Sequence, residues 1–168
     1  MSRGFVKEDD QEEVPMVPPR ADLPEGVTNY VTPEGMNELL EEKQMLLEEK
    51  DNPGGSNENE NRIALNHINA KLSLLEDRIA SARIVDLKGE APDEIRFGAH
   101  VQLRNAALNR IQVFQIVGVD EADVSRGKIA FTSPVARALI NKKAGDRAVL
   151  KRGRDELVFE ILEVRYSG

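Results

Sequence analysis

The sequence predicts an α+β fold, in which an N-terminal antiparallel helical hairpin of the coiled-coil type precedes a small twisted sheet covered by one helix. Apolar residues recur at helical spacing over residues 33–82, and a Pro-Gly-Gly break divides that stretch in two. After residue 92 the apolar pattern changes to alternation with a period of two. We therefore expect an acidic, proline-rich arm over 1–31, the hairpin over 32–86 and a C-terminal domain over 93–168.

The composition excludes several classes of protein. The 168 residues, 40% of them apolar, can build one modest core or two small ones. There is no cysteine and there are only two histidines, so a disulfide framework, a thiol nucleophile and a thiolate or histidine metal centre are excluded. Without a long apolar run or a signal-peptide pattern, we expect a cytoplasmic protein that neither enters a membrane nor holds a metal of its own.

The arm is rich in proline and acidic residues. Half of the eight prolines fall within the first 24 residues, where few large apolar side chains are available for burial. Such a composition does not offset the entropy lost on ordering, so we expect an extended or disordered arm. An apolar stretch within it, VPMVPP at 14–19, is either a loose tail or a segment that lies along a groove of this protein or of a partner.

The first helix is predicted from Pro33 to about Lys50. Thr32 is a suitable cap, and a proline at the first helical position costs no hydrogen bond. An apolar stripe for burial is formed by Met36, Leu39, Leu40, Met45, Leu46 and Leu47. The segment DNPGGSN, residues 51–57, then breaks the helix.

The second helix carries the most regular pattern of the chain. Apolar residues follow one another at intervals of 3, 4, 3, 4 and 3, which places them along one side of a coiled-coil helix. These residues are Leu65, Ile68, Leu72, Leu75, Ile79 and Ala82. Since a short turn joins two amphipathic helices, we expect them to fold back on each other and bury their stripes.

The C-terminal domain is predicted to contain strands with one buried face each. The residues expected in that face are Val101, Leu103, Ile111, Val113, Ile129, Phe131, Leu157, Phe159 and Ile161. One helix interrupts the strands, with Ser133 as its cap and Pro134 as its first residue. Its apolar side, formed by Val135, Ala138 and Leu139, is expected to cover the sheet.

The charges are unevenly distributed. The hairpin region 33–86 has a net charge of −6, whereas residues 87–168, with 14 basic and 11 acidic side chains, have a net charge of +3. A basic run is formed by Lys142, Lys143, Arg147, Lys151, Arg152 and Arg154. Such a run is usually a solvated face, and without interleaved aromatic residues we expect at most weak, salt-sensitive contact with nucleic acid.

Four stretches resemble the bacterial Gre transcript-cleavage factors. The longest reads QIVGVDEAD at 115–123, continues with GKI at 127–129 and ends with SPVARALINKKAGD at 133–146. The final strand, EILEVRY at 160–166, also fits this family. YVTPEG at 30–35 and ARIVD at 82–86 resemble the entry and the exit of the family's helical hairpin.

The resemblance implies a C-terminal domain with the fold of FK506-binding prolyl isomerases and a bacterial RNA polymerase partner. In the Gre factors this domain docks at the rim of the polymerase secondary channel, and the hairpin enters it. The implied polymerase-binding residues are Ser133, Pro134, Val135, Ala136 and Arg137. Carboxylates at the family's hairpin tip help to hold a magnesium ion in the polymerase active site. The active site of polymerase then hydrolyses the backtracked transcript.

The tip departs from the family pattern, which reads roughly Gly-Asp-x-x-Glu-Asn. Aligned with GGSNEN at 54–59, the family aspartate falls on Gly55, while Glu58 matches. Asp51 and Glu60 are the nearest substitutes for the missing carboxylate. Asn57 followed by Glu60 also has the form of a helix cap, which would occupy Glu60 in the turn.

The predicted hairpin is about a dozen residues shorter than that of a Gre factor, roughly 18 Å at the helical rise. In this it resembles the Rnk-type polymerase-binding regulators, which do not promote cleavage. We therefore expect a monomeric elongation regulator without strong cleavage stimulation and without a cofactor of its own. The alternative is a true cleavage-stimulating factor that shares magnesium with polymerase through Asp51, Glu58 and Glu60. We discount a prolyl isomerase, because most aromatic residues occupy expected core positions.

Overall fold

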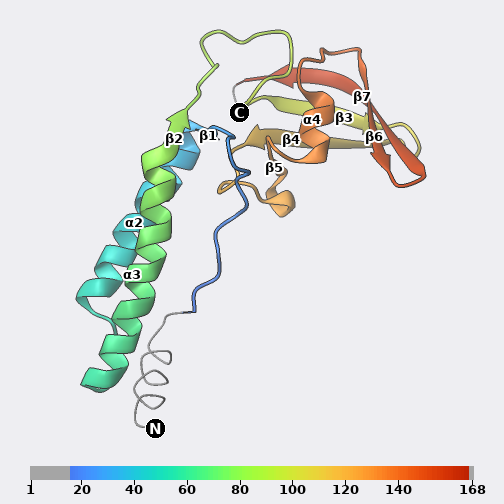
Figure 1. Ribbon diagram of the computed structural model, residues 1–168. Coiled ribbons are helices and arrows are strands. Elements are labelled where there is room, and N and C mark those ends of the chain that lie inside the picture. The colour runs from blue at the N-terminus through green and yellow to red at the C-terminus, as the bar shows by residue number, and fades with distance from the viewer. Residues whose placement is uncertain (1–15, 167–168) are drawn as a thin grey trace. The chain divides into compact units, whose positions relative to one another are not determined.

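The computed structural model describes residues 16–166 and confirms the α+β class (Figure 1). The chain divides into two compact units. Among the described residues, unit 1 consists of 16–21 and 37–81, and unit 2 consists of 22–36 and 82–166. This division differs from the expected boundaries, because residues 22–36 cluster with the C-terminal residues instead of with the arm and the hairpin. The expectation for residues 1–15, including the start of the VPMVPP stretch, lies outside the described residues.

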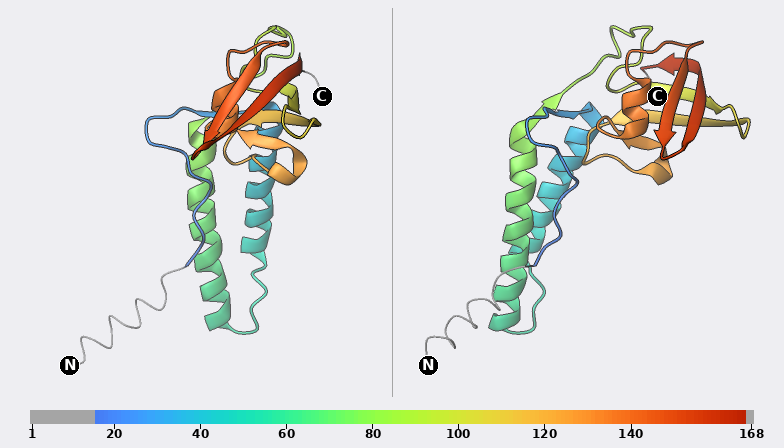
Figure 2. Two further views of the ribbon diagram at one scale, coloured as in Figure 1. Left: turned by 90° about the vertical axis from the view of Figure 1, so that its right-hand side faces the viewer. Right: turned by 45° about the vertical axis from the view of Figure 1, so that its right-hand side comes forward.

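Unit 1 is built on two antiparallel helices, α2 (Pro33–Asp51) and α3 (Glu58–Ser81), which run side by side and are joined by residues 52–57 (Figure 2). Thr32 caps α2 as predicted: its hydroxyl accepts a hydrogen bond from the Gly35 N–H at 2.9 Å. The buried side chains between the helices are Leu39, Leu46, Ile68, Leu72 and Leu75.

The predicted stripe of α2 was too wide. Leu39 and Leu46 are buried, but Leu40, Met45 and Leu47 remain exposed. The two buried residues are seven positions apart, so α2 contacts its neighbour along a narrow seam, as paired helices do. On α3 the centre of the predicted seam is buried, while Leu65 and Ile79 near its ends are only half-buried.

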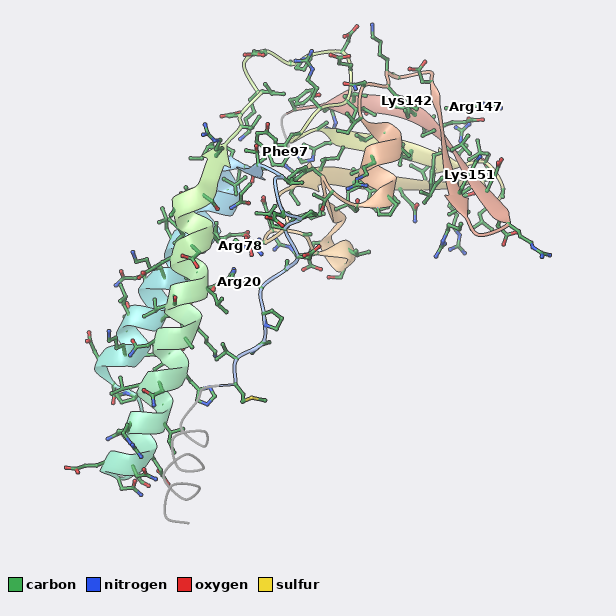
Figure 3. The ribbon with its side chains drawn as sticks, in the orientation of Figure 1. Arg20, Arg78, Phe97, Lys142, Arg147 and Lys151 are labelled. Atoms are coloured by element: carbon green, nitrogen blue, oxygen red, sulfur yellow. The ribbon has the colours of Figure 1, made fainter. Side chains whose placement is uncertain are left out.

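Residues 16–28 have no regular secondary structure. The part of this segment that belongs to unit 1 is held by both helices. Arg20 donates to the Glu42 carboxylate of α2 at 2.6 and 3.2 Å, and Arg78 of α3 donates to the carbonyl oxygen of Ala21. Residues 20 and 21 of the arm therefore lie against the hairpin (Figure 3).

Unit 2 contains a five-stranded sheet with the order β5-β4-β3-β7-β6. Its strands are β3 (His100–Asn105), β4 (Arg110–Val117), β5 (Lys128–Ala130), β6 (Arg147–Arg152) and β7 (Asp155–Arg165). Neighbouring strands are antiparallel except for β4 and β5. Helix α4 (Pro134–Leu139) packs on one face, where Ala136 and Leu139 join the buried residues of the sheet in a single core.

The burial predicted for the start of β4 was wrong. Ile111 and Val113 are 55% and 49% exposed, because they lie on the face of the sheet that α4 does not cover. The covered face of β4 carries Phe114 and Ile116 instead. Alternation identifies the two faces of a strand but does not show which face is covered.

Three strands were not predicted. Besides β6, they are β1 (Asn29–Val31) and β2 (Ala82–Ile84), which form a separate parallel pair within unit 2. A short 3-10 turn, η1 (Val124–Arg126), precedes β5. No helix formed by the described residues is long and apolar enough to cross a membrane.

Candidate functional site

The residues predicted to bind polymerase lie at the start of α4. The Ser133 hydroxyl caps the helix by accepting a hydrogen bond from the Ala136 N–H at 3.3 Å, and Pro134 occupies the first helical position. Ala136 is fully buried in the core and Val135 is half-buried, whereas Pro134 and Arg137 are exposed. Of the five residues, Pro134 and Arg137 therefore present the largest free surface to a partner.

An aromatic cluster belongs to the same unit. Tyr30, Phe97 and Phe131 meet with ring centroids 5.6–5.8 Å apart, two of the three pairs edge to face. Tyr30 is exposed, and Phe97 and Phe131 are only half-buried, so the expectation that these phenylalanines lie in the core holds only in part. Phe131 is two residues from Ser133 in the chain. Half-exposed aromatic rings of this kind are enriched at protein interfaces.

The predicted tip residues lie on both sides of the hairpin turn. Asp51 is the last residue of α2, and Glu58 is the first of α3. Asn57 accepts a hydrogen bond from the Glu60 N–H at 2.9 Å, and one Glu60 oxygen accepts from the Ser56 N–H and hydroxyl at 2.8 and 2.6 Å. These hydrogen bonds from Ser56 lower the pKa of Glu60. The capping interpretation is thus confirmed.

The turn has no room for the carboxylate that the family pattern places at residue 55. A Cβ atom added to Gly55 would overlap the side-chain oxygen and the backbone nitrogen of Asn61. Glu60, one of the two substitutes, is engaged in the turn by its hydrogen bonds. Among residues 16–166 no three histidine, cysteine or acidic side chains gather closely enough to hold a metal ion.

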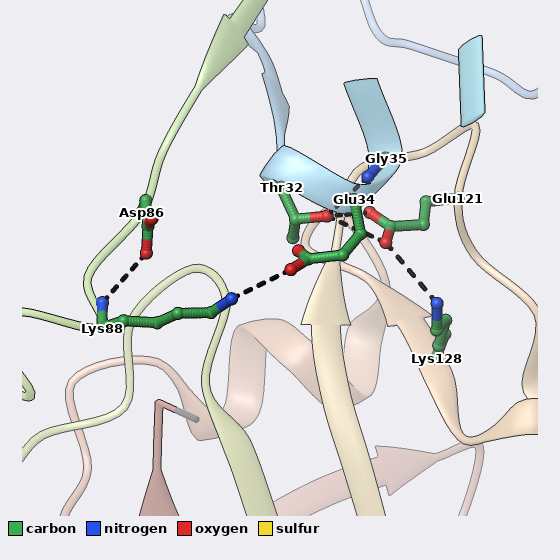
Figure 4. A network of polar contacts seen from close by, with 7 residues as sticks. All are labelled: Thr32, Glu34, Gly35, Asp86, Lys88, Glu121 and Lys128. Atoms are coloured by element: carbon green, nitrogen blue, oxygen red, sulfur yellow. Dashed lines mark hydrogen bonds and ion pairs between the residues drawn. The ribbon is translucent and has the colours of Figure 1, made fainter. Parts of the chain in front are cut away.

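A polar network within unit 2 was not predicted (Figure 4). The Thr32 hydroxyl donates to the Glu121 carboxylate, 2.8 and 2.7 Å from its two oxygens, and Lys128 pairs with the same carboxylate at 3.6 Å. The Glu121 side chain is only 4% exposed. The two motifs that carry these residues, YVTPEG and QIVGVDEAD, were the only signal in the sequence that could have pointed to this contact.

A second ion pair lies beside this network. Lys88 donates to the Glu34 carboxylate at 2.9 Å, and this contact lowers the pKa of Glu34 and raises that of Lys88. The backbone N–H of Lys88 is held by the Asp86 carboxylate at 3.1 Å. Both side chains of the pair are about half exposed, so it contributes little to stability. It does join the first turn of α2 to the segment that follows β2.

The basic run is largely matched by acidic residues. In the pairing of β6 with β7, Arg147 lies opposite Glu160, Lys151 opposite Glu156 and Arg152 opposite Asp155. Two further contacts join Arg147 to Glu160 at 3.6 Å and Lys143 to Asp93 at 3.3 Å. Figure 3 shows Arg147 and Lys151 on strand β6. Cross-strand pairs of opposite charge reduce the positive field that a nucleic acid would meet.

Residues 90–166 match the family model described as "Transcription elongation factor, GreA/GreB, C-term". Two relatives named Transcription elongation factor GreA, from Hyphomonas neptunium and Sinorhizobium medicae, are each 39% identical to this chain. The matches cover 60% and 62% of this chain and 64% and 66% of the relatives, so less than two thirds of either relative is matched.

Among solved structures, the chain is similar to GreA factor homolog 1 of Thermus thermophilus and to a GreA/GreB elongation factor of Nitrosomonas europaea. The first is 21% identical with a TM-score of 0.39, covering 83% of this chain and 99% of that one. The second is 22% identical with a TM-score of 0.40, covering 82% and 98%. Over residues 90–166 this chain is therefore similar to the C-terminal domain of the GreA/GreB elongation factors.

Proposed function

We propose that this chain is a regulator of transcription elongation that binds bacterial RNA polymerase at its secondary channel and does not strongly stimulate transcript cleavage. The similarity of residues 90–166 to the GreA/GreB C-terminal domain and the relatives named as elongation factors support the polymerase partner. In this proposal the chain acts as a cytoplasmic monomer. It has no catalytic residues and no cofactor of its own, and any magnesium belongs to the polymerase.

Docking is assigned to the start of α4. Pro134 and Arg137 are exposed there, while Ala136 anchors the helix in the core, so the surface is presented on a fixed support. The half-exposed rings of Tyr30, Phe97 and Phe131 belong to the same unit and offer apolar area of the kind that dominates protein interfaces. Nucleic acid plays at most a minor part, because the basic side chains of β6 lie opposite acidic side chains of β7.

The proposal that this chain does not strongly stimulate cleavage rests on the structure of the hairpin turn. Gly55 has no room for a carboxylate, and Glu60 is held by the N–H and hydroxyl of Ser56. A carboxylate that positions magnesium and water has to be available and placed to within about an ångström, or the rate falls by roughly a hundredfold. Freeing Glu60 would break the hydrogen bonds that order the turn.

Transcript shortening in backtracked polymerase complexes tests this proposal. At saturating protein we expect little shortening by the wild-type chain, and we expect it to inhibit the shortening stimulated by an added Gre factor, because both compete for the channel. Robust shortening that the double variant Glu58→Ala, Glu60→Ala abolishes would instead establish the cleavage-stimulating alternative. Glu76→Ala, at an exposed acidic residue within α3, serves as the matched control.

The dock is tested separately. Replacing Pro134 by glutamate puts a charge on the exposed start of α4 while an acidic residue in a first helical turn keeps the helix stable. We expect binding to core polymerase to weaken about tenfold or more with an unchanged melting temperature. Arg110→Glu, at an exposed residue of β4, is the control for the change of charge. Unchanged affinity of the Pro134→Glu variant would place the dock elsewhere.

A further inference from the structure

The polar network of Figure 4 joins two stretches that are far apart in the sequence and that neither the dock nor the hairpin tip uses. Thr32 and Glu121 are separated by 89 positions, yet the hydroxyl and the carboxylate are in direct hydrogen-bond contact. Both residues are buried. Burying a carboxylate costs free energy unless its partners offset the lost hydration. We therefore asked what the buried Glu121 carboxylate does for this protein.

We propose that Glu121 is a positioning residue: together with Thr32 and Gly35 it forms a seat that fixes the first turn of α2 within unit 2. For its consequence at the polymerase this proposal rests on the proposed function. Through the seat, Glu121 determines how reliably the hairpin turn reaches polymerase once the C-terminal domain has docked. Glu121 itself contacts neither polymerase nor transcript.

The geometry of the first turn supports a dedicated seat. The Thr32 hydroxyl uses its hydrogen to bind Glu121 and its lone pair to accept from the Gly35 N–H, so one side chain links the cap of α2 to the carboxylate. A Cβ atom at residue 35 would lie 2.5 Å from a Glu121 oxygen. The carboxylate therefore packs directly against the backbone of the turn, and only glycine leaves it that space.

The charge of Glu121 is compensated from its own unit. Lys128, whose side chain is only 16% exposed, lies 3.6 Å from one carboxylate oxygen. The start of a helix also favours a negative charge close to its free N–H groups. The neighbouring Glu34 remains in water and pairs with Lys88, so the helix start already has an exposed acidic residue. Helix polarity alone thus does not explain why a second carboxylate is buried here.

The seat extends the support that strand β1 already receives. Pairing with β2 holds residues 29–31, the Val85 N–H donates to the Val31 carbonyl oxygen at 2.9 Å, and Gly118 allows the backbone at Tyr30 to approach closely. These contacts end at the strand. Thr32, Gly35 and Glu121 continue the support through the turn from strand to helix, and α2 starts from that turn.

Hydrogen exchange on the free protein tests whether the seat exists. In Thr32→Val, which removes the hydroxyl and keeps the shape, we expect the Gly35 amide to exchange about tenfold faster than in the wild type. Glu121→Gln should have the same effect in direction, and Thr32→Ser should restore protection. Thr28→Val, at an exposed threonine of the same segment, is the matched control. Unchanged exchange at Gly35 in both Thr32→Val and Glu121→Gln would overturn the seat.

A crosslinking experiment tests the consequence at the polymerase. Because the chain has no cysteine, Asn52→Cys provides a single attachment point for a photo-crosslinker in the hairpin turn. In the Thr32→Val and Glu121→Gln backgrounds we expect the affinity for core polymerase to stay within about twofold, while the crosslink yield at saturation falls about fivefold or more. Thr32→Ser should restore the yield.

The pattern of outcomes separates the two proposals. If affinity and yield fall together, or if neither changes, Glu121 is not a positioning residue. If the wild-type chain does not bind polymerase, the proposed function is wrong, and the exchange of Gly35 in the free protein still decides whether the seat exists. Should Thr32→Val fail to fold, Glu121→Gln carries both measurements, because it keeps the shape of the side chain.

Discussion

The two units of this molecule are stabilised in different ways. Unit 2 buries a continuous core that includes Val101, Leu103, Ile116, Phe159 and Ile161 and is completed by α4. Unit 1 relies on a narrow seam along two helices, on helix caps and on the arm residues that bind both helices. A two-helix unit has little interior, so each of its buried side chains carries a larger share of the stability.

This difference teaches that the units can be perturbed one at a time, and the chain offers a separate probe for each. Both tyrosines, Tyr30 and Tyr166, belong to unit 2, and there is no tryptophan. Helices α2 and α3 contain 19 and 24 residues, against 6 in α4, so the helical ellipticity reports mainly on the hairpin. The tyrosine signal therefore follows unit 2, and the helical ellipticity follows the hairpin.

The largest effect is expected in the core of unit 2. Leu103→Ala removes a fully buried side chain from the centre of the sheet, which costs about 3 kcal/mol for the lost burial and the cavity left behind. We expect the midpoint of the tyrosine transition to fall by about 10 °C or more and the ellipticity transition to change much less. Ile111→Ala, at an exposed position on β4, should change the midpoint by no more than about 2 °C.

A somewhat smaller effect is expected in the hairpin. Leu75→Ala removes a fully buried side chain of α3 and should cost about 2.5 kcal/mol, since the open sides of a two-helix unit can relax around the cavity. The ellipticity transition should then fall while the tyrosine transition stays in place. Leu74→Ala, the exposed neighbour on the same helix, is the control. If both signals shift together in both leucine variants, the units unfold as one and the comparison fails.

The helix cap of the hairpin turn should have a smaller effect. Asn57→Ala removes the acceptor of the Glu60 N–H at the start of α3, which costs about 1 kcal/mol. We expect faster hydrogen exchange at residues 58–61 and a slightly lower ellipticity midpoint, with no change in the tyrosine signal. Asn52→Ala, which lies in the same turn, should leave the exchange unchanged. Equal protection in the two variants would contradict the role of Asn57 as a cap.

The smallest effect concerns pH. Burial, with a contribution from the positive charge of Arg165, lowers the pKa of His100 below its ordinary value of 6.5. The unfolded chain then binds a proton more readily than the folded one, so unit 2 should lose stability as the pH falls below 6.5. Lys128 and Lys88 act in the same direction as Arg165, and Glu34 opposes them.

His100→Gln should flatten this dependence between about pH 7 and about pH 5.5, as followed by the tyrosine transition. His67→Gln, in α3, should leave it unchanged, which makes use of the only other histidine of the chain. If the two variants show the same dependence as the wild type, another group in unit 2 is responsible for it.

Features set by local sequence could be predicted. The caps at Thr32, Asn57 and Ser133 and the helices that follow them depend on residues only a few positions apart, and the structure confirms all three. The change from helical to alternating periodicity placed the sheet correctly after residue 92. Features that depend on distant contacts were missed.

The missed strands show which features the periodicity of the sequence does not reveal. Strands β1 and β2 have three residues each, too few for a periodic signal, and they pair across about 50 residues. In β6 the buried residues are Ala148 and, in part, Leu150, while Arg147 and Lys151 gave the segment the look of a charged surface. The contact of Thr32 with Glu121 could not be derived either, because neither residue type by itself indicates a buried partner.

The parallel pairing of β1 with β2 has a consequence for how the chain folds and how it tolerates changes in length. The hairpin connects β1 to β2, so the pairing of these two strands closes a loop of about 50 residues. If the helices form first, less flexible chain remains in the loop. Pairing of β1 with β2 then costs less conformational entropy. For the same reason, whole helical turns can be added to or removed from the hairpin without shifting the register of β1 against β2.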